Sequence, residues 1–348
     1  MPETNKLKSR KLLIVILLLA ALGTVAIVFY QRSTQSPESA RLLPEGDNIG
    51  YLNCSPASWC RRAAESHPVQ HDPEYKEFID ATGIQFERDL DDVAIARRDT
   101  PDGKDTESSE VFSGRFDSQR LRAYLANISA SQENYSGRQI YSIPHEGHTV
   151  RVSLLDPKRI AVTNMASADS MHEIIDASTR HGQGPSLLQT YYEHVPTGSL
   201  AWLIARVGPS QQPQIPGGFN FDFLQNTVSV ASLRFTGEIH FRGDVFAGTE
   251  KDAAHIVDSA GTFLSLYRAI EKSWGPKGAD PDIKAAIDSI QVTQNKNVAS
   301  ITATLPQRFV TKIASEAPAV ITSPAPPEPS PSPSPTQLPH NRRRYRRL

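Results

Sequence analysis

The stretch LLIVILLLAALGTVAIVFY, residues 12–30, carries no charged residue, no proline and a single glycine. In an α-helix, at about 1.5 Å per residue, it would measure roughly 29 Å, which matches the hydrocarbon core of a bilayer. A helix that is apolar on every side and begins a chain is not typical of a globular core. The sequence therefore predicts one transmembrane helix over residues 12–30.

The charges on either side of this segment predict its orientation. Only Arg32 follows it closely, whereas four basic residues precede it. These are Lys6, Lys8, Arg10 and Lys11. The positive-inside rule then keeps residues 1–11 in the cytoplasm and places the rest of the chain outside it, as a single-pass, periplasmic protein.

A cleaved signal peptide is the alternative to this uncleaved signal-anchor. The apolar core of such a peptide is usually about 7–15 residues long and ends at a site with small residues. Here the apolar segment is longer, and its best cleavage match, Thr24-Val25-Ala26, lies inside it. We therefore favour the signal-anchor.

The net charge of −1 hides an uneven distribution. The chain has 37 basic and 38 acidic residues, and 11 of the basic and 4 of the acidic ones lie outside residues 44–315. Residues 44–315, here called the body, therefore hold 26 basic and 34 acidic residues, a net charge of −8. An acidic body repels phosphate backbones, so we expect no nucleic-acid partner. Cys54 and Cys60 lie in this part of the chain, and two interpretations stay open: a disulfide or two thiols.

The body is predicted to be an α+β fold, with mainly antiparallel sheets and helices packed on one face. Its strands come as hairpins, such as 228–236 with 238–247, and Asp117 is a typical N-cap for a helix over 118–128. We divide the chain into a cytoplasmic N-terminus (1–11), the transmembrane anchor (12–30), a polar stalk (31–43), two α+β units (44–195 and 196–315), and a disordered Pro-rich tail with a basic end (316–348).

The second unit repeats parts of the first, which indicates an internal duplication. Pro196-Thr197-Gly198 repeats the Pro-x-Gly turn that begins at Pro44, and Asp280-Pro281 repeats the helix start at Asp72-Pro73. The hairpin and helix over 149–180 correspond to those over 229–260, and the order of the elements is partly permuted between the halves.

One cluster has the side chains that bind metals. His145, Glu146 and His148 are predicted to lie at a hairpin tip, where they could bind zinc or copper. Their spacing differs from the helical H-E-x-x-H motif, so a plain polar turn is the alternative. The sequence contains no G-x-S-x-G serine motif and no P-loop, so we expect no catalytic residue and no cofactor.

The tail differs in composition from the body. Residues 316–339 contain nine prolines and few large apolar residues, so they cannot form a core. The chain then ends in a dense cation. Its arginines are Arg342, Arg343, Arg344, Arg346 and Arg347. Because arginine binds phosphate and carboxylate well, we expect this end to contact an anionic envelope surface or to fold back on the acidic body, with a solvated tail as the alternative.

The layout resembles uncharacterised bacterial single-span envelope proteins with a duplicated α+β ectodomain. The resemblance rests on the anchor, on Leu42-Leu43-Pro44 before the first strand and on Val195-Pro196-x-Gly198 before the second unit. It implies location and fold but no activity. The sequence therefore predicts a membrane-anchored, extracytoplasmic binding or scaffold protein. The alternative is an envelope enzyme, such as a metal-assisted hydrolase.

Overall fold

The computed structural model describes residues 35–54, 73–100, 106–145, 147–180, 182–208, 214–215, 219–220, 225–273, 281–306 and 308. The predicted anchor over 12–30 and the Pro-rich tail over 316–348 lie outside these residues. Within the described ranges, no helix is both long and apolar enough to cross a membrane.

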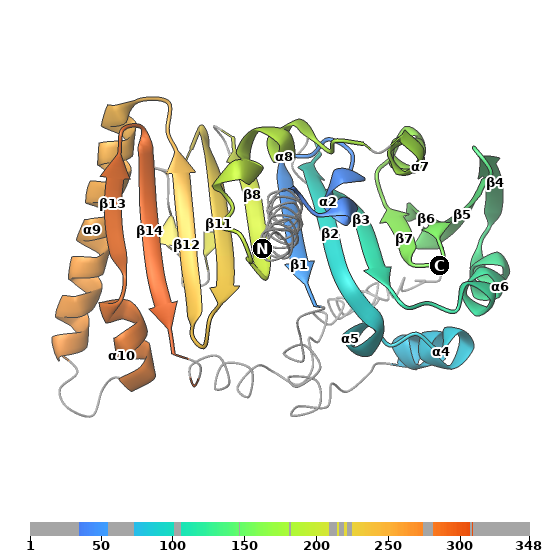
Figure 1. Ribbon diagram of the computed structural model, residues 1–348, viewed down its shortest axis with the longest axis horizontal. Coiled ribbons are helices and arrows are strands. Elements are labelled where there is room, and N and C mark those ends of the chain that lie inside the picture. Colours follow the sequence, from blue (N-terminus) through green and yellow to red (C-terminus); the bar gives the residue numbers. More distant parts are fainter. Residues whose placement is uncertain are drawn as a thin grey trace, which may run out of the picture. The chain divides into compact units, whose positions relative to one another are not determined.

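An α+β fold is confirmed, built on one large antiparallel sheet (Figure 1). Its strand order is β13-β14-β12-β11-β8-β1-β2-β3-β7-β6-β5-β4. The strands are β1 (Asn48–Asn53), β2 (Leu90–Asp99), β3 (Thr106–Gly114), β4 (Ser131–Tyr135), β5 (Arg138–His145), β6 (His148–Asp156), β7 (Arg159–Thr163), β8 (Ala201–Val207), β11 (Thr227–Phe235), β12 (Ile239–Phe246), β13 (Gln291–Asn295) and β14 (Val298–Leu305). The short strands β9 (Gln214–Ile215) and β10 (Phe219–Asn220) pair with each other.

Eight α-helices and one 3-10 helix are described around these strands. They are α2 (Glu38–Arg41), α4 (Pro73–Thr82), α5 (Phe86–Asp89), α6 (Ser118–Ile128), α7 (Asp169–Arg180), α8 (Ser186–Tyr191), the 3-10 helix η1 (Tyr192–His194), α9 (Glu250–Ser273) and α10 (Pro281–Asp288). The predicted cap of α6 is present, because the Asp117 side chain accepts hydrogen bonds from the backbone N–H groups of Gln119 and Arg120.

Helices cover both faces of the sheet, which corrects the expectation of one covered face. Val111 and Ala161 are register partners whose side chains share one face, here called the first face, where α2, α7 and α8 pack in the largest core. Ile160 points the other way and belongs to a second core with Leu121 and Leu125 of α6. Strand alternation and register put α9 on this second face too, at the opposite end of the sheet.

The predicted stalk over 31–43 is partly wrong. Residues 38–41 form α2, and Ala40, Leu42 and Leu43 are buried in the first-face core. Burying these apolar side chains stabilises a segment whose charged residues had indicated an exposed linker.

The two predicted units share one sheet. β1, from the unit over 44–195, pairs with β2 on one side and with β8 of the unit over 196–315 on the other. Tyr51 of β1 and Trp202 of β8 are register partners in the core. The hydrophobic core therefore extends across the predicted boundary between the two units, through the β1–β8 pair.

Candidate functional site

The predicted metal ligands lie at the tip of the β5–β6 hairpin. His145 and His148 are directly opposite each other in the register, and both are exposed. Side chains of opposed residues in an antiparallel pair share a face. Glu146 lies outside the described residues. Among the described residues, no three side chains of the metal-binding types come together in one group.

A pocket of about 370 Å³ lies beside this hairpin. His148 is on its rim, but strand alternation places the two histidines on the second face and Arg151 on the first. The residues that matter for its chemistry are Thr100, Glu107, Thr149, Arg151, Asn164 and Ala166. Strand alternation therefore puts the side chains of His145 and His148 on the other face of the hairpin from Arg151, although His148 also lines the pocket.

Three strands bring the pocket's wall together. The register aligns Ser109 of β3, Thr163 of β7 and Arg151 of β6 in one row. The hydroxyl oxygens of Ser109 and Thr163, both buried, lie 2.7 Å apart. Glu107 is two residues from Ser109 along β3, so the two side chains share a face.

The loop after β7 is fastened to both neighbouring strands. The Oδ1 atom of Asn164 accepts a hydrogen bond of 2.6 Å from the Ser108 backbone N–H. Arg151 donates from Nη1 to the Met165 carbonyl at 2.9 Å and from Nη2 to the Ala166 carbonyl at 3.4 Å. The Ala166 N–H donates to Glu107 Oε1 at 2.9 Å. These bonds hold the side chains of Arg151 and Glu107 in place before any ligand arrives.

Arg151 and Glu107 do not neutralise each other. Both line the pocket, yet among the described ion pairs none joins them within 4.0 Å. A guanidinium has five N–H groups, and Arg151 uses two of them on the loop carbonyls. The pocket thus presents one cation and one anion, each with capacity for a further partner.

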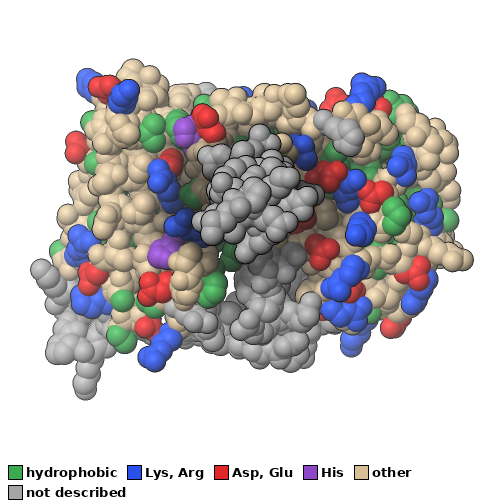
Figure 2. Space-filling view, in the orientation of Figure 1, with side chains coloured by type: hydrophobic (Ala, Val, Ile, Leu, Met, Phe, Trp, Pro, Cys, Tyr) green, Lys and Arg blue, Asp and Glu red, His purple; other side chains and the backbone are tan. Residues whose placement is uncertain are grey.

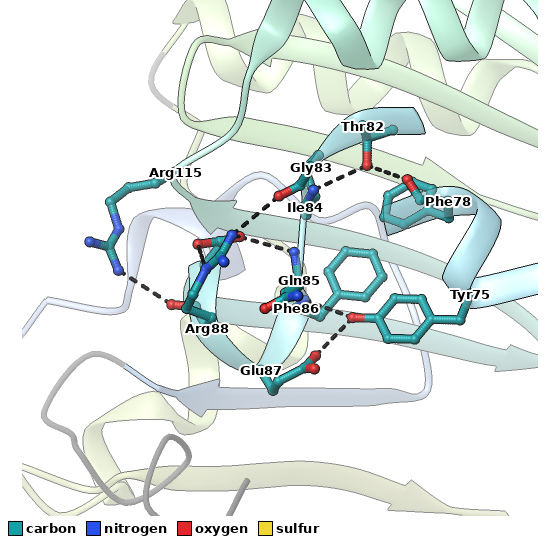
Figure 3. A network of polar contacts seen from close by, with 11 residues as sticks. Tyr75, Phe78, Thr82, Gly83, Ile84, Gln85, Phe86, Glu87, Arg88 and Arg115 are labelled. Carbon is teal, nitrogen blue, oxygen red and sulfur yellow. Dashed lines mark hydrogen bonds and ion pairs between the residues drawn. The ribbon is translucent and has the colours of Figure 1, made fainter. Parts of the chain in front are cut away.

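A denser polar network lies at the α4–α5 corner (Figure 3). Arg88 binds both carboxylate oxygens of Asp89, which also accepts from the Gln85 N–H at 2.9 Å. Tyr75 donates to Glu87 at 2.8 Å and accepts from the Phe86 N–H. Burial raises the pKa of Tyr75 to about 12. Because these groups bind one another, we assign the network a structural role, which is to stabilise the α4–α5 corner.

Sequence reasoning did not identify the charged pocket. Glu107 and Ala166 are 59 residues apart, and only the sheet register brings them together. Cys54 lies half-buried after β1 and Cys60 lies outside the described residues, so both interpretations, a disulfide or two thiols, stay open. On the face shown in Figure 2, acidic and basic side chains are interspersed.

Comparisons with known proteins give no family. No protein-family model matches the sequence, and no curated protein matches it. Three crystal forms of TP0453 are similar in structure. Form III has a TM-score of 0.46 at 14% identity and covers 80% of this chain and 99% of that one. Form IV has a TM-score of 0.43 at 12% identity and covers 80% of this chain and 97% of that one. Form I has a TM-score of 0.41 at 14% identity and covers 80% of this chain and 98% of that one. At these scores the likeness supports no argument about function.

Proposed function

We propose that this chain is a membrane-anchored, extracytoplasmic binding protein and that the pocket at Arg151 is its ligand site. One observation carries the proposal: Arg151 and Glu107 line the same pocket, are held by the 164–166 loop, and form no ion pair with each other. Preorganised charges with unused hydrogen-bonding capacity are typical of binding sites. The role needs no catalytic group.

Ligand-observed NMR on the full chain in a mild detergent tests the pocket. A mixed set of small anions, cations, sugars and amino acids should contain at least one molecule whose binding is lost in an Arg151→Gln, Glu107→Gln double variant. The matched control changes two exposed residues, Arg122→Gln and Glu74→Gln, and should bind as the wild type does. Equal binding by both variants would remove this pocket as the ligand site.

The proposed topology rests on residues 12–30 and their flanking charges. A reporter enzyme that works only in the cytoplasm, fused after Arg308, should be silent. The full chain should stay with the membrane after a high-salt wash. Reporter activity would reverse the orientation, and a soluble periplasmic product would favour the cleaved signal peptide.

The basic C-terminus is proposed to contact an anionic envelope surface. Each arginine near such a surface contributes about 1 kcal/mol, and salt screens this attraction. The full chain in nanodiscs of zwitterionic lipid should bind anionic vesicles at low salt and be released near roughly 0.5 M salt. A chain lacking residues 341–348 should not bind. Equal binding by both chains would assign the contact elsewhere.

A second candidate function, that of a metal-assisted hydrolase, is favoured by the register of the hairpin tip. His145 and His148 are opposed in the register, a spacing from which two imidazoles can reach one metal ion. Zinc that is stoichiometric in the full chain and absent from a His145→Ala, His148→Ala variant would support it. Zinc at equal levels in both proteins would argue against this site.

The two halves of the sheet are proposed to derive from a duplication. Read outwards from the β1–β8 pair, the orders β1-β2-β3-β7-β6 and β8-β11-β12-β14-β13 correspond element by element. This correspondence differs from the permuted one that the sequence suggested, and it makes β4–β5 an insertion in the first half. Superposition of residues 48–163 on residues 201–305, strand for strand, would support this proposal, and a mismatch of the paired strands would contradict it.

A further inference from the structure

We infer that the pocket binds a compact zwitterion of the α-amino acid class, with the ligand's carboxylate on Arg151 and its ammonium group on Glu107. This inference rests on the proposed binding function and adds the chemical class of the ligand.

Ala166 limits the distance between the two charged groups. Its N–H lies 2.9 Å from Glu107 Oε1, and its carbonyl oxygen lies 3.4 Å from Arg151 Nη2. Since the N and O atoms of one residue are roughly 3.5 Å apart or less, the carboxylate and the guanidinium lie within roughly 10 Å of each other. They are also more than 4.0 Å apart, because no ion pair joins them.

An α-amino acid fits this interval. Its ammonium nitrogen and carboxylate carbon are separated by two covalent bonds, roughly 2.5 Å in space. With a hydrogen bond of about 2.9 Å at each end, the molecule bridges two protein groups up to roughly 8–9 Å apart. A ligand with widely separated charges would exceed the limit set by Ala166.

The charges of the pocket also disfavour simpler ions. A phosphate or other anion on Arg151 would lie near the Glu107 carboxylate, and a simple cation on Glu107 would lie near the guanidinium. A zwitterion satisfies both charges at once, which avoids leaving either of them desolvated and unpaired. The Thr149 hydroxyl lines the same pocket and offers a further donor or acceptor to the ligand.

The contacts of the two residues allow substitutions that separate recognition from folding. Glu107→Gln removes the charge but keeps an Oε1 acceptor for the Ala166 N–H. Arg151→Lys keeps the charge but loses the planar fork that binds a carboxylate through two bonds. Exposed Glu74→Gln and Arg122→Lys serve as the matched controls.

The test is calorimetric titration of the full chain in detergent with glycine, L-alanine and L-glutamine. N-acetyl-L-alanine, which lacks the ammonium group, and L-alaninamide, which lacks the carboxylate, are the analogues. At least one amino acid should bind, and both analogues should bind roughly tenfold or more weakly than L-alanine. Glu107→Gln should weaken L-alanine but bind N-acetyl-L-alanine at least as tightly as the wild type does, because the repulsion from the Glu107 carboxylate is gone. Both control variants should behave as the wild type does.

The outcomes distinguish this inference from the proposed function. Binding of acetate or phosphate, lost in Arg151→Lys but with no preference for amino acids, would overturn the zwitterion and keep the binding site. The absence of any pocket-dependent binding would overturn both. If Arg151→Lys fails to fold in a thermal melt, the Glu107→Gln variant and the two analogues still decide the matter.

Discussion

Tyr51 of β1 and Trp202 of β8 stack against each other, with ring centroids 5.5 Å apart and ring planes at 21°. They are register partners at the centre of the sheet, and Tyr192 of η1 packs edge-on against the same indole. Trp202 is 4% exposed. The pair therefore joins the two predicted units through an aromatic contact within the first-face core.

Trp202→Ala should destabilise the whole sheet. Removing a buried tryptophan typically costs about 3–5 kcal/mol, from lost burial and from the cavity left behind. Leu203→Ala, one residue along β8 and 44% exposed, is the matched control and should cost much less. Urea unfolding followed by far-UV circular dichroism measures both. Equal losses would show that the aromatic pair does not couple the units.

Asp92→Asn should stabilise the protein at neutral pH. Burial raises the pKa of Asp92 more than the Ser39 and Ser113 hydroxyls lower it, and its Oδ1 atom is buried without a described hydrogen-bond partner. A folded-state pKa that is raised above the unfolded-state pKa adds stability below the unfolded-state pKa, and this stability is lost as pH rises through the folded-state pKa.

The variant should therefore gain about 1 kcal/mol at pH 7 and match the wild type in acid below the unfolded-state pKa. Thermal melts across this pH range measure the difference. The neighbouring Asp91→Asn is the control, and a gain of the same size there would refute the explanation by burial.

Asp89→Asn should show the opposite pH dependence. Burial opposes ionisation of Asp89, but the hydrogen bonds from the Arg88 side chain and the Gln85 N–H outweigh it, and the pKa is lowered. The stability that this carboxylate contributes is present above its unfolded-state pKa and is lost as pH falls through the folded-state pKa. The variant should be less stable than the wild type at pH 7, with the gap closing in acid. A constant gap would contradict the electrostatic cause.

Gly184→Ala should cost more than Gly198→Ala. Both glycines have positive φ angles, +83° and +79°, so alanine strains the backbone at either position. A Cβ atom at Gly184 would lie 2.8 Å from a Leu188 methyl group and 3.0 Å from Arg41 Cα, whereas at Gly198 it would meet nothing within 4 Å. Denaturant unfolding should show about 1 kcal/mol for Gly198→Ala and clearly more for Gly184→Ala. Equal costs would mean that α2 and α8 move apart easily.

Local signals in the sequence were sufficient for most elements of the sheet. Asp117 marked the start of α6 and Gly237 the turn between β11 and β12, because caps and turns depend on nearby residues. The edge strand β4 was missed. Its sequence SQENY is polar and mostly exposed, so it lacks the apolar alternation that identifies a strand. The helices' choice of sheet face also depends on contacts between distant residues.

The candidate site was less predictable than the fold. His145 and His148 were found because they lie only three residues apart in the sequence, and their metal role stays a prediction. Arg151 and Glu107 lie in unremarkable strands, and their proximity follows from the β3–β7–β6 register. β3 and β7 are distant in the sequence, and no local sequence motif determines how two such strands align.

The β1–β8 pair also has a consequence for how the chain folds. About 150 residues separate these neighbouring strands, so the centre of the sheet closes late and the loop-closure entropy is high. Until β8 arrives, the β1–β2 side of a growing chain has a bare edge of unpaired backbone groups, a template for pairing with another copy. Folding yield, more than native stability, should therefore be sensitive to temperature, to concentration and to any change that slows delivery of residues 201–207.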